Sequence, residues 1–184
     1  MQEFKLYMLL LGAKPPGRHT EQHDIFFGIG TSLKDCLPDI FSFWPEAKKK
    51  IHIDAWRDVQ IVNGFRVQVV PRTAHAIEGQ LVKLFFINLG GYRPAEFEEF
   101  HYKMIIAAVN KDAAIAQAKK TAFFLHCDSP HVDDKYGVDV DDIYEITDIL
   151  PFSVKESYSL LLMPEENVVE DEIHLGYLKI DQVK

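Results

Sequence analysis

Cysteine is scarce in this chain of 184 residues, which contains only Cys36 and Cys127. Without a Cys-x-x-Cys spacing or a further thiol, neither a zinc knuckle nor a disulfide framework is expected to support the fold. A hydrophobic share of 47% is enough to bury a full core without such cross-links. Both cysteines are therefore predicted to be small core residues.

Positive charge is also scarce, because 20 Lys and Arg face 28 Asp and Glu, for a net charge of -8. Residues 1–80 carry 10 bases and 9 acids, whereas residues 81–184 carry 10 bases and 19 acids. Nucleic-acid binding is not expected without a sustained basic face to neutralise phosphates. The short tract of three lysines at 48–50 is typical of a solvated helix end.

Long hydrophobic runs are missing as well. The apolar run at 6–11, with Phe4 close by, follows Glu3; it is too short for a membrane span and is wrongly flanked for a signal peptide. We therefore predict no membrane partner and a cytoplasmic location.

The chain resembles itself after a shift of 78 positions, which places residues 5–23 on residues 83–101 without a gap. Seven of these nineteen positions are identical, where about one identity is expected by chance. With a shift of 79, residues 52–67 fall on residues 131–146, and His52 and Asp54 match His131 and Asp133. The similarity predicts two tandem copies of one structural unit.

Periodicity and turn residues predict the elements of one copy. Two dense apolar runs, at 4–11 and 24–30, indicate strands joined by a Gly/Pro loop. Residues 31–44 show helical spacing after the possible N-caps Thr31 and Ser32, and Pro38 requires a kink or a later helix start. Asn63 and Gly64 favour a hairpin between strands at 50–62 and 65–70.

These elements predict an α+β fold of two tandem strand-strand-helix-strand-strand repeats with antiparallel sheets, plus a C-terminal strand extension. The helix of the second copy is expected within residues 110–125. The predicted boundaries are 1–72 for the first repeat, 82–151 for the second, and 152–184 for an extension packed on the repeats. Further strands are expected at 158–163 and 172–180.

The stretch GAKPPGRHTEQHDIFFGIG at 12–30, followed by HIDAWRDV and NGF, resembles the bacterial proteins grouped as domain of unknown function family 1543. The resemblance covers most of residues 4–150 and implies one or two units per chain. It implies no activity, catalytic residue or cofactor. The second copy departs from the pattern where Gly17, Arg18 and Asp24 become Ala95, Glu96 and Tyr102, so the first copy is the better candidate for a binding site.

Two motifs are the strongest candidates for chemistry, because both recur in the predicted repeat. Glu21-x-His23 recurs as Glu99-x-His101, and His52-x-Asp54 as His131-x-Asp133. On a strand, residues two apart share a face, so each motif presents a carboxylate beside an imidazole. Brought together, the two pairs would suit a divalent metal such as zinc, or general acid/base catalysis without metal.

The alternative is structural, because histidines beside carboxylates near strand ends commonly tie a loop to a neighbouring strand. A separate hypothesis concerns the loop, where Lys14, Arg18 and His19 would bind a carboxylate or phosphate through charge-assisted hydrogen bonds. The first hypothesis for function is therefore a module that binds a small anionic ligand or a protein. The second is a metal-dependent enzyme, hydrolase-like, that uses Glu21, His23, His52 and Asp54, with a divalent metal as its cofactor.

Overall fold

The computed structural model describes residues 3–47, 50–73, 77–92, 95–120, 129–130, 132–133, 137–138, 140–166 and 168–183. The fold is α+β, as predicted, with mostly antiparallel sheets and few helices. The chain divides into two compact units, residues 1–78 with 150–184, and residues 79–149. We call them unit 1 and unit 2 and describe each by itself.

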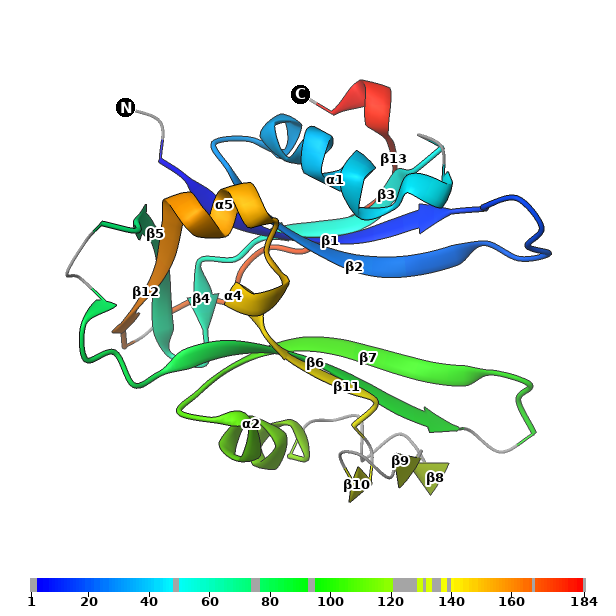
Figure 1. Ribbon diagram of the computed structural model, residues 1–184. Helices are drawn as coiled ribbons and strands as arrows, with labels where there is room; N and C mark the ends of the chain where they lie inside the picture. Colours follow the sequence, from blue (N-terminus) through cyan, green and yellow to red (C-terminus); the bar gives the residue numbers. More distant parts are fainter. Residues whose placement is uncertain are drawn as a thin grey trace. The chain divides into compact units, whose positions relative to one another are not determined.

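Unit 1 is built on two antiparallel sheets, with strand orders β13-β3-β1-β2 and β12-β5-β4 (Figure 1). Its strands are β1 Lys5–Ala13, β2 Gln22–Gly30, β3 His52–Asp58, β4 Ile61–Val62, β5 Phe65–Pro71, β12 Tyr158–Pro164 and β13 His174–Lys179. Its helices are α1 Leu37–Phe43 and α5 Phe152–Ser157, with 3-10 turns at Leu33–Cys36, Pro45–Ala47 and Ile180–Gln182.

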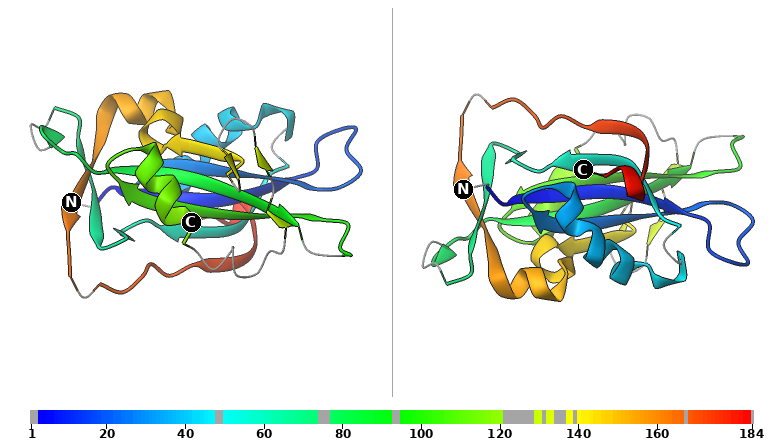
Figure 2. Two further views of the ribbon diagram at one scale, coloured as in Figure 1. Left: turned by 90° about the horizontal axis from the view of Figure 1, so that it is seen from below. Right: turned by 90° about the horizontal axis from the view of Figure 1, so that it is seen from above.

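Alternation along β1 places one set of side chains under α1. Tyr7, Leu9 and Leu11 pack with Ile40 of α1 and Ile53 of β3 in one buried cluster. Figure 2 shows α1 lying across the strands of this sheet. The intervening residues of β1, including position 12, therefore point to the face of the sheet that α1 does not cover.

The chain enters α1 through a 3-10 turn that Asp35 caps. The Asp35 carboxylate accepts hydrogen bonds from the backbone N–H of Thr31 and of Ser32 at 2.8 and 3.0 Å. These bonds lower the pKa of Asp35, with the side-chain bond from Thr31 as the largest cause. Pro38 lies in the first turn of α1, so the later helix start is the alternative that the structure shows.

Asn63 and Gly64 form the predicted hairpin turn between β4 and β5, with φ of 49° and 80°. The extended segment expected at 50–62 is interrupted after Asp58, so β4 belongs to the second sheet rather than continuing β3. The two C-terminal strands are present as expected. Strand β12 pairs with β5 and β13 pairs with β3, and both are therefore part of unit 1.

Unit 2 contains a sheet of order β11-β6-β7, with β8 also paired to β6, and a separate ladder of β9 and β10. Its strands are β6 Lys83–Tyr92, β7 Glu99–Ala108, β8 Ser129–Pro130, β9 Val132–Asp133, β10 Gly137–Val138 and β11 Asp142–Glu145. Its helices are α2 Lys111–Ala118 and α4 Ile146–Ile149. Within the described part of this unit, the helix is followed by short strands and β11, rather than by the predicted strand pair.

Helix α2 begins where the sequence predicts, because the side chain of Asn110 accepts a hydrogen bond from the backbone N–H of Ala113 at 2.8 Å. Ala114 and Ala118 face the sheet and pack against Phe85 and Ile87. Residues 121–125 of the predicted helix lie outside the described residues. No helix among the described residues is long and apolar enough to span a membrane.

Candidate functional site

The candidate site of unit 1 is centred on Gly12, which lies between two histidines. In the strand register, Gly12 is opposite His23 of β2 and opposite His52 of β3. Directly paired residues point to the same face of a sheet, so both imidazoles lie on the face opposite α1. A bulge in the β1–β3 pairing between Leu10 and Leu11 leaves Asp54 without a paired position and turns its side chain towards Gly12.

The structure brings together all four residues of the two motifs. Nε2 of His23 lies 3.3 Å from Oδ2 of Asp54 and 3.7 Å from Oε2 of Glu21. Nε2 of His52 lies 3.3 Å from the same Asp54 oxygen and 3.3 Å from Oε1 of Glu21. The two imidazoles and two carboxylates thus form a closed ring of contacts, which we call the His/carboxylate cluster.

His52 is the buried member of this cluster, with 6% of its surface exposed. Its Nε2 atom and Oδ2 of Asp54 are both buried and have no hydrogen-bond partner among the described residues. The ring of Tyr177, from β13, packs against the His52 imidazole with centroids 4.4 Å apart. Glu21 and His23 are exposed, so the cluster has one buried side and one side open to solvent.

Gly12 provides the space that the cluster occupies. A Cβ atom at this position would stand less than 3.0 Å from Nε2 and Cε1 of His52 and from Oδ2 of Asp54. A residue with a side chain therefore cannot occupy position 12 while the two side chains keep their places. The requirement for glycine here is steric, because its backbone conformation is that of an ordinary strand.

The basic loop residues are placed differently. Lys14, Arg18 and His19 are all exposed between β1 and β2, in the loop that leads to Glu21. The backbone N–H of Arg18 donates to the carbonyl of Pro15 at 3.3 Å, and Gly17 has φ of 82°, which closes a tight turn. A backbone turn therefore fixes the shape of this loop. The loop leads to Glu21, on the exposed side of the cluster.

A related arrangement occurs in unit 2. Gly90 of β6 is opposite His101 of β7, and Nε2 of His101 lies 3.1 Å from Oδ2 of Asp141 and 3.9 Å from Oε2 of Glu99. A Cβ atom at Gly90 would stand less than 3.0 Å from three atoms of the Asp141 side chain. Position 90 thus has the same steric requirement as position 12.

The second sequence alignment, at a shift of 79, is wrong for Asp133. Asp133 belongs to β9, which pairs with β10, and Asp141 is the carboxylate next to His101. Its predicted companion His131 lies outside the described residues. Sequence reasoning missed Asp141 because it used a shift of 79, whereas a shift of 87 is needed to place Asp54 on Asp141. The signal was present, since that shift aligns Asp54 with Asp141 and Asp58 with Glu145.

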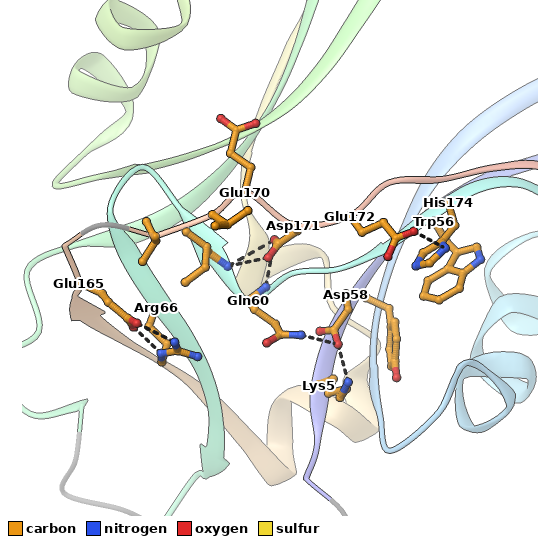
Figure 3. Close-up of a pocket in the computed structure, with 14 residues that line it drawn as sticks. Lys5, Trp56, Asp58, Gln60, Arg66, Glu165, Glu170, Asp171, Glu172 and His174 are labelled. Carbon is orange, nitrogen blue, oxygen red and sulfur yellow. Dashed lines mark hydrogen bonds and ion pairs between the residues drawn. The ribbon is translucent and has the colours of Figure 1, made fainter.

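Unit 1 also has a pocket of about 640 Å³ that none of the four cluster residues lines (Figure 3). Its lining side chains are largely paired with one another. Lys5 forms an ion pair with Asp58 at 2.6 Å, and the His174 ring stacks on Trp56 with centroids 3.9 Å apart. Asp171 accepts hydrogen bonds from two backbone N–H groups of the β3–β4 connection, each at 3.0 Å.

These contacts hold the segment between β12 and β13 against β3, β4 and β5. Burial is the main cause that raises the pKa of Asp171, although its two backbone bonds oppose the shift. The charged side chains of the pocket are thus largely paired, although Oδ1 of Asp58 is buried without a hydrogen bond, whereas in the His/carboxylate cluster an imidazole nitrogen and a carboxylate oxygen that face each other both lack hydrogen bonds. The cluster is the better candidate for a functional site.

Comparison with known proteins agrees with the sequence resemblance. No curated protein matches the chain. In fold, the chain is similar to the protein Il1583 from Idiomarina loihiensis, whose crystal structure aligns with a TM-score of 0.63 and 20% sequence identity. That alignment covers 97% of this chain and 99% of the other. Residues 18–69, which include Glu21, His23, His52 and Asp54, match the model of the family described as Domain of Unknown Function (DUF1543).

Proposed function

We propose that the protein binds a divalent transition-metal ion, with zinc as the best fit, through Glu21, His23, His52 and Asp54. The observation that carries this proposal is the buried Nε2 of His52, which lacks a hydrogen bond and faces two carboxylate oxygens at 3.3 Å. A buried polar atom without a partner costs about 1–3 kcal/mol. A metal ion would use the lone pair of this nitrogen and remove that cost.

The charges of the cluster support a divalent cation. Two ionised carboxylates lie next to two imidazoles, and no Lys or Arg forms an ion pair with any of the four residues among the described contacts. Neutral imidazoles and carboxylates are common zinc ligands. A divalent cation would balance the negative charge of the two carboxylates.

The distances within the cluster leave room for an ion between neighbouring ligand atoms. Two atoms bonded to one ion at about 2.1 Å can stand up to about 4.2 Å apart. Oδ2 of Asp54 lies 3.3 Å from Nε2 of each histidine, and Glu21 approaches His52 through Oε1 at 3.3 Å and His23 through Oε2 at 3.7 Å.

A metal-dependent hydrolase is the second candidate, and the exposure of Glu21 and His23 favours it. An ion on the open side of the cluster can exchange one protein ligand for water, and zinc activates bound water for attack on a substrate. Lys14, Arg18 and His19 lie in the adjoining loop and would attract an anionic substrate. A module that binds an anionic ligand or a protein without metal is supported less, because these three side chains are exposed in the loop and none of them lines the pocket of Figure 3.

The two units also support an origin by tandem duplication. Lys5 and Asp58 of unit 1 form an ion pair, and Lys83 and Glu145 form one in unit 2 at 2.8 Å. Gly17 and Ala95 both have φ in the left-handed region, at 82° and 63°. A shift of 78 relates Lys5 to Lys83 and Gly17 to Ala95, and a shift of 87 relates Asp58 to Glu145. The same two shifts relate the residues of the two clusters. We infer that the clusters descend from one ancestral site.

The test is zinc binding by the full chain, measured by competition with a chromophoric chelator. We expect His52→Ala and His23→Ala to weaken the tightest zinc site by more than about 100-fold, since even changes to residues behind the ligands cost 10–100-fold. His19→Ala, an exposed histidine outside the cluster, serves as the control and retains wild-type zinc affinity. Unchanged affinity in both His52→Ala and His23→Ala would refute the proposal.

A further inference from the structure

We infer that unit 2 holds a second metal site, formed by Glu99, His101 and Asp141. The inference rests on the proposed function, because the geometry of the His/carboxylate cluster guides the comparison. It extends that function from one site to two.

The three residues already have metal-binding spacing. One ligand atom of each lies within 4.8 Å of the other two. Two ligand atoms bonded to the same ion at about 2.1 Å can stand up to about 4.2 Å apart. The distances of 3.1 and 3.9 Å from His101 Nε2 to the two carboxylates fall within that limit.

Side chains behind the ligands hold them in place. Tyr92 is paired with Glu99 across the β6–β7 ladder, and its hydroxyl donates to Oε1 of Glu99 at 3.0 Å. Oε2, the other oxygen of Glu99, is the atom that faces His101. Gly90 leaves room for the Asp141 carboxylate, so a hydrogen bond orients one ligand and a missing side chain makes space for another.

The two sites share their donor types. The first presents two imidazoles and two carboxylates, and the described residues of the second present an imidazole and two carboxylates. Imidazole nitrogen and carboxylate oxygen are both zinc ligands, so the same ion suits both sites.

The experiment is a zinc titration of the full chain by competition with a chromophoric chelator. The wild type should bind two zinc ions per chain. His101→Ala and Asp141→Asn should each remove one of the two ions and leave the other bound, and His52→Ala should remove that other ion. Asp141→Asn keeps the shape of the side chain, and a circular dichroism spectrum confirms that each variant folds.

Each outcome separates this inference from the proposed function. A single zinc ion in the wild type that stays bound in His101→Ala and Asp141→Asn, or two ions that stay bound in both variants, would overturn the second site and leave the first standing. Loss of one ion in His52→Ala and of the other in His101→Ala would support both sites. Two ions that stay bound in His52→Ala, with one lost in His101→Ala, would overturn the first site and leave the second standing.

Discussion

Replacement of Gly12 by alanine tests the geometry of the His/carboxylate cluster without removing a ligand. The new Cβ atom would stand less than 3.0 Å from His52 Nε2 and Cε1 and from Asp54 Oδ2. Those atoms are the far ends of side chains, so the strands can stay paired while both ligands move away. We therefore expect a modest loss of stability and a large loss of metal affinity.

The size of each effect follows from general magnitudes. Overpacking by one methyl group costs about 1–3 kcal/mol of unfolding free energy in metal-free protein. Displacement of two ligands should weaken zinc binding by more than about 100-fold, which corresponds to about 2.8 kcal/mol at 1.4 kcal/mol per tenfold change. In wild-type protein, zinc at 100 times its dissociation constant should add about 2.7 kcal/mol of stability, and Gly12→Ala should lose nearly all of it.

The assay is urea unfolding of each variant with zinc and with a chelator. Gly17→Ala is the matched control, because position 17 has φ of 82° with no atom within 4 Å of a new Cβ. It should lose about 1 kcal/mol from backbone strain alone and keep the full gain from zinc. A Gly12→Ala protein that gains as much stability from zinc as the wild type would refute the reasoning.

Three further predictions concern other parts of the chain. Burial raises the pKa of Cys36 to about 12. In a Cys127→Ser background, the Cys36 thiol should therefore react with a disulfide reagent at pH 8 at least about 1,000-fold more slowly in folded than in unfolded protein. Equal reaction rates would contradict this burial. Ala95 has φ of 63°, so Ala95→Gly should raise the unfolding free energy by about 1 kcal/mol, and a loss in chemical denaturation would count against this conformation. Burial raises the pKa of Asp171, so the folded state binds this proton more tightly than the unfolded chain, and the contribution of Asp171 to stability falls as pH rises through the folded pKa. Asp171→Asn cannot titrate and should show a smaller fall in unfolding free energy between pH 4 and 7 than the wild type, whereas identical pH profiles would contradict the shift.

Local sequence signals were sufficient for much of unit 1. The apolar run before the Gly/Pro loop predicted β1, and Asn63-Gly64 predicted its hairpin, because both depend on neighbouring residues. Long-range pairing was not predictable in the same way. The pairing of β13 with β3, which brings Tyr177 against His52, joins residues far apart in the chain and leaves no trace in local periodicity.

The candidate site was predictable in composition and not in geometry. The Glu-x-His and His-x-Asp motifs identified the residues, because a spacing of two indicates a shared strand face. Their meeting depends on Gly12 being paired with both histidines and on the bulge at Asp54, neither of which the motifs contain. Asp141 was missed because the second alignment used a shift of 79, whereas a shift of 87 places Asp54 on Asp141.

An anomalous diffraction map, collected at the zinc absorption edge from crystals grown with stoichiometric zinc, is the most direct test of the central claim. The account predicts a peak about 2.0–2.2 Å from His52 Nε2, with bonds to atoms of Glu21, His23 and Asp54. The same peak should be missing in crystals of His52→Ala. Zinc peaks elsewhere with none at this cluster, although the protein binds zinc fully in solution, would contradict the account.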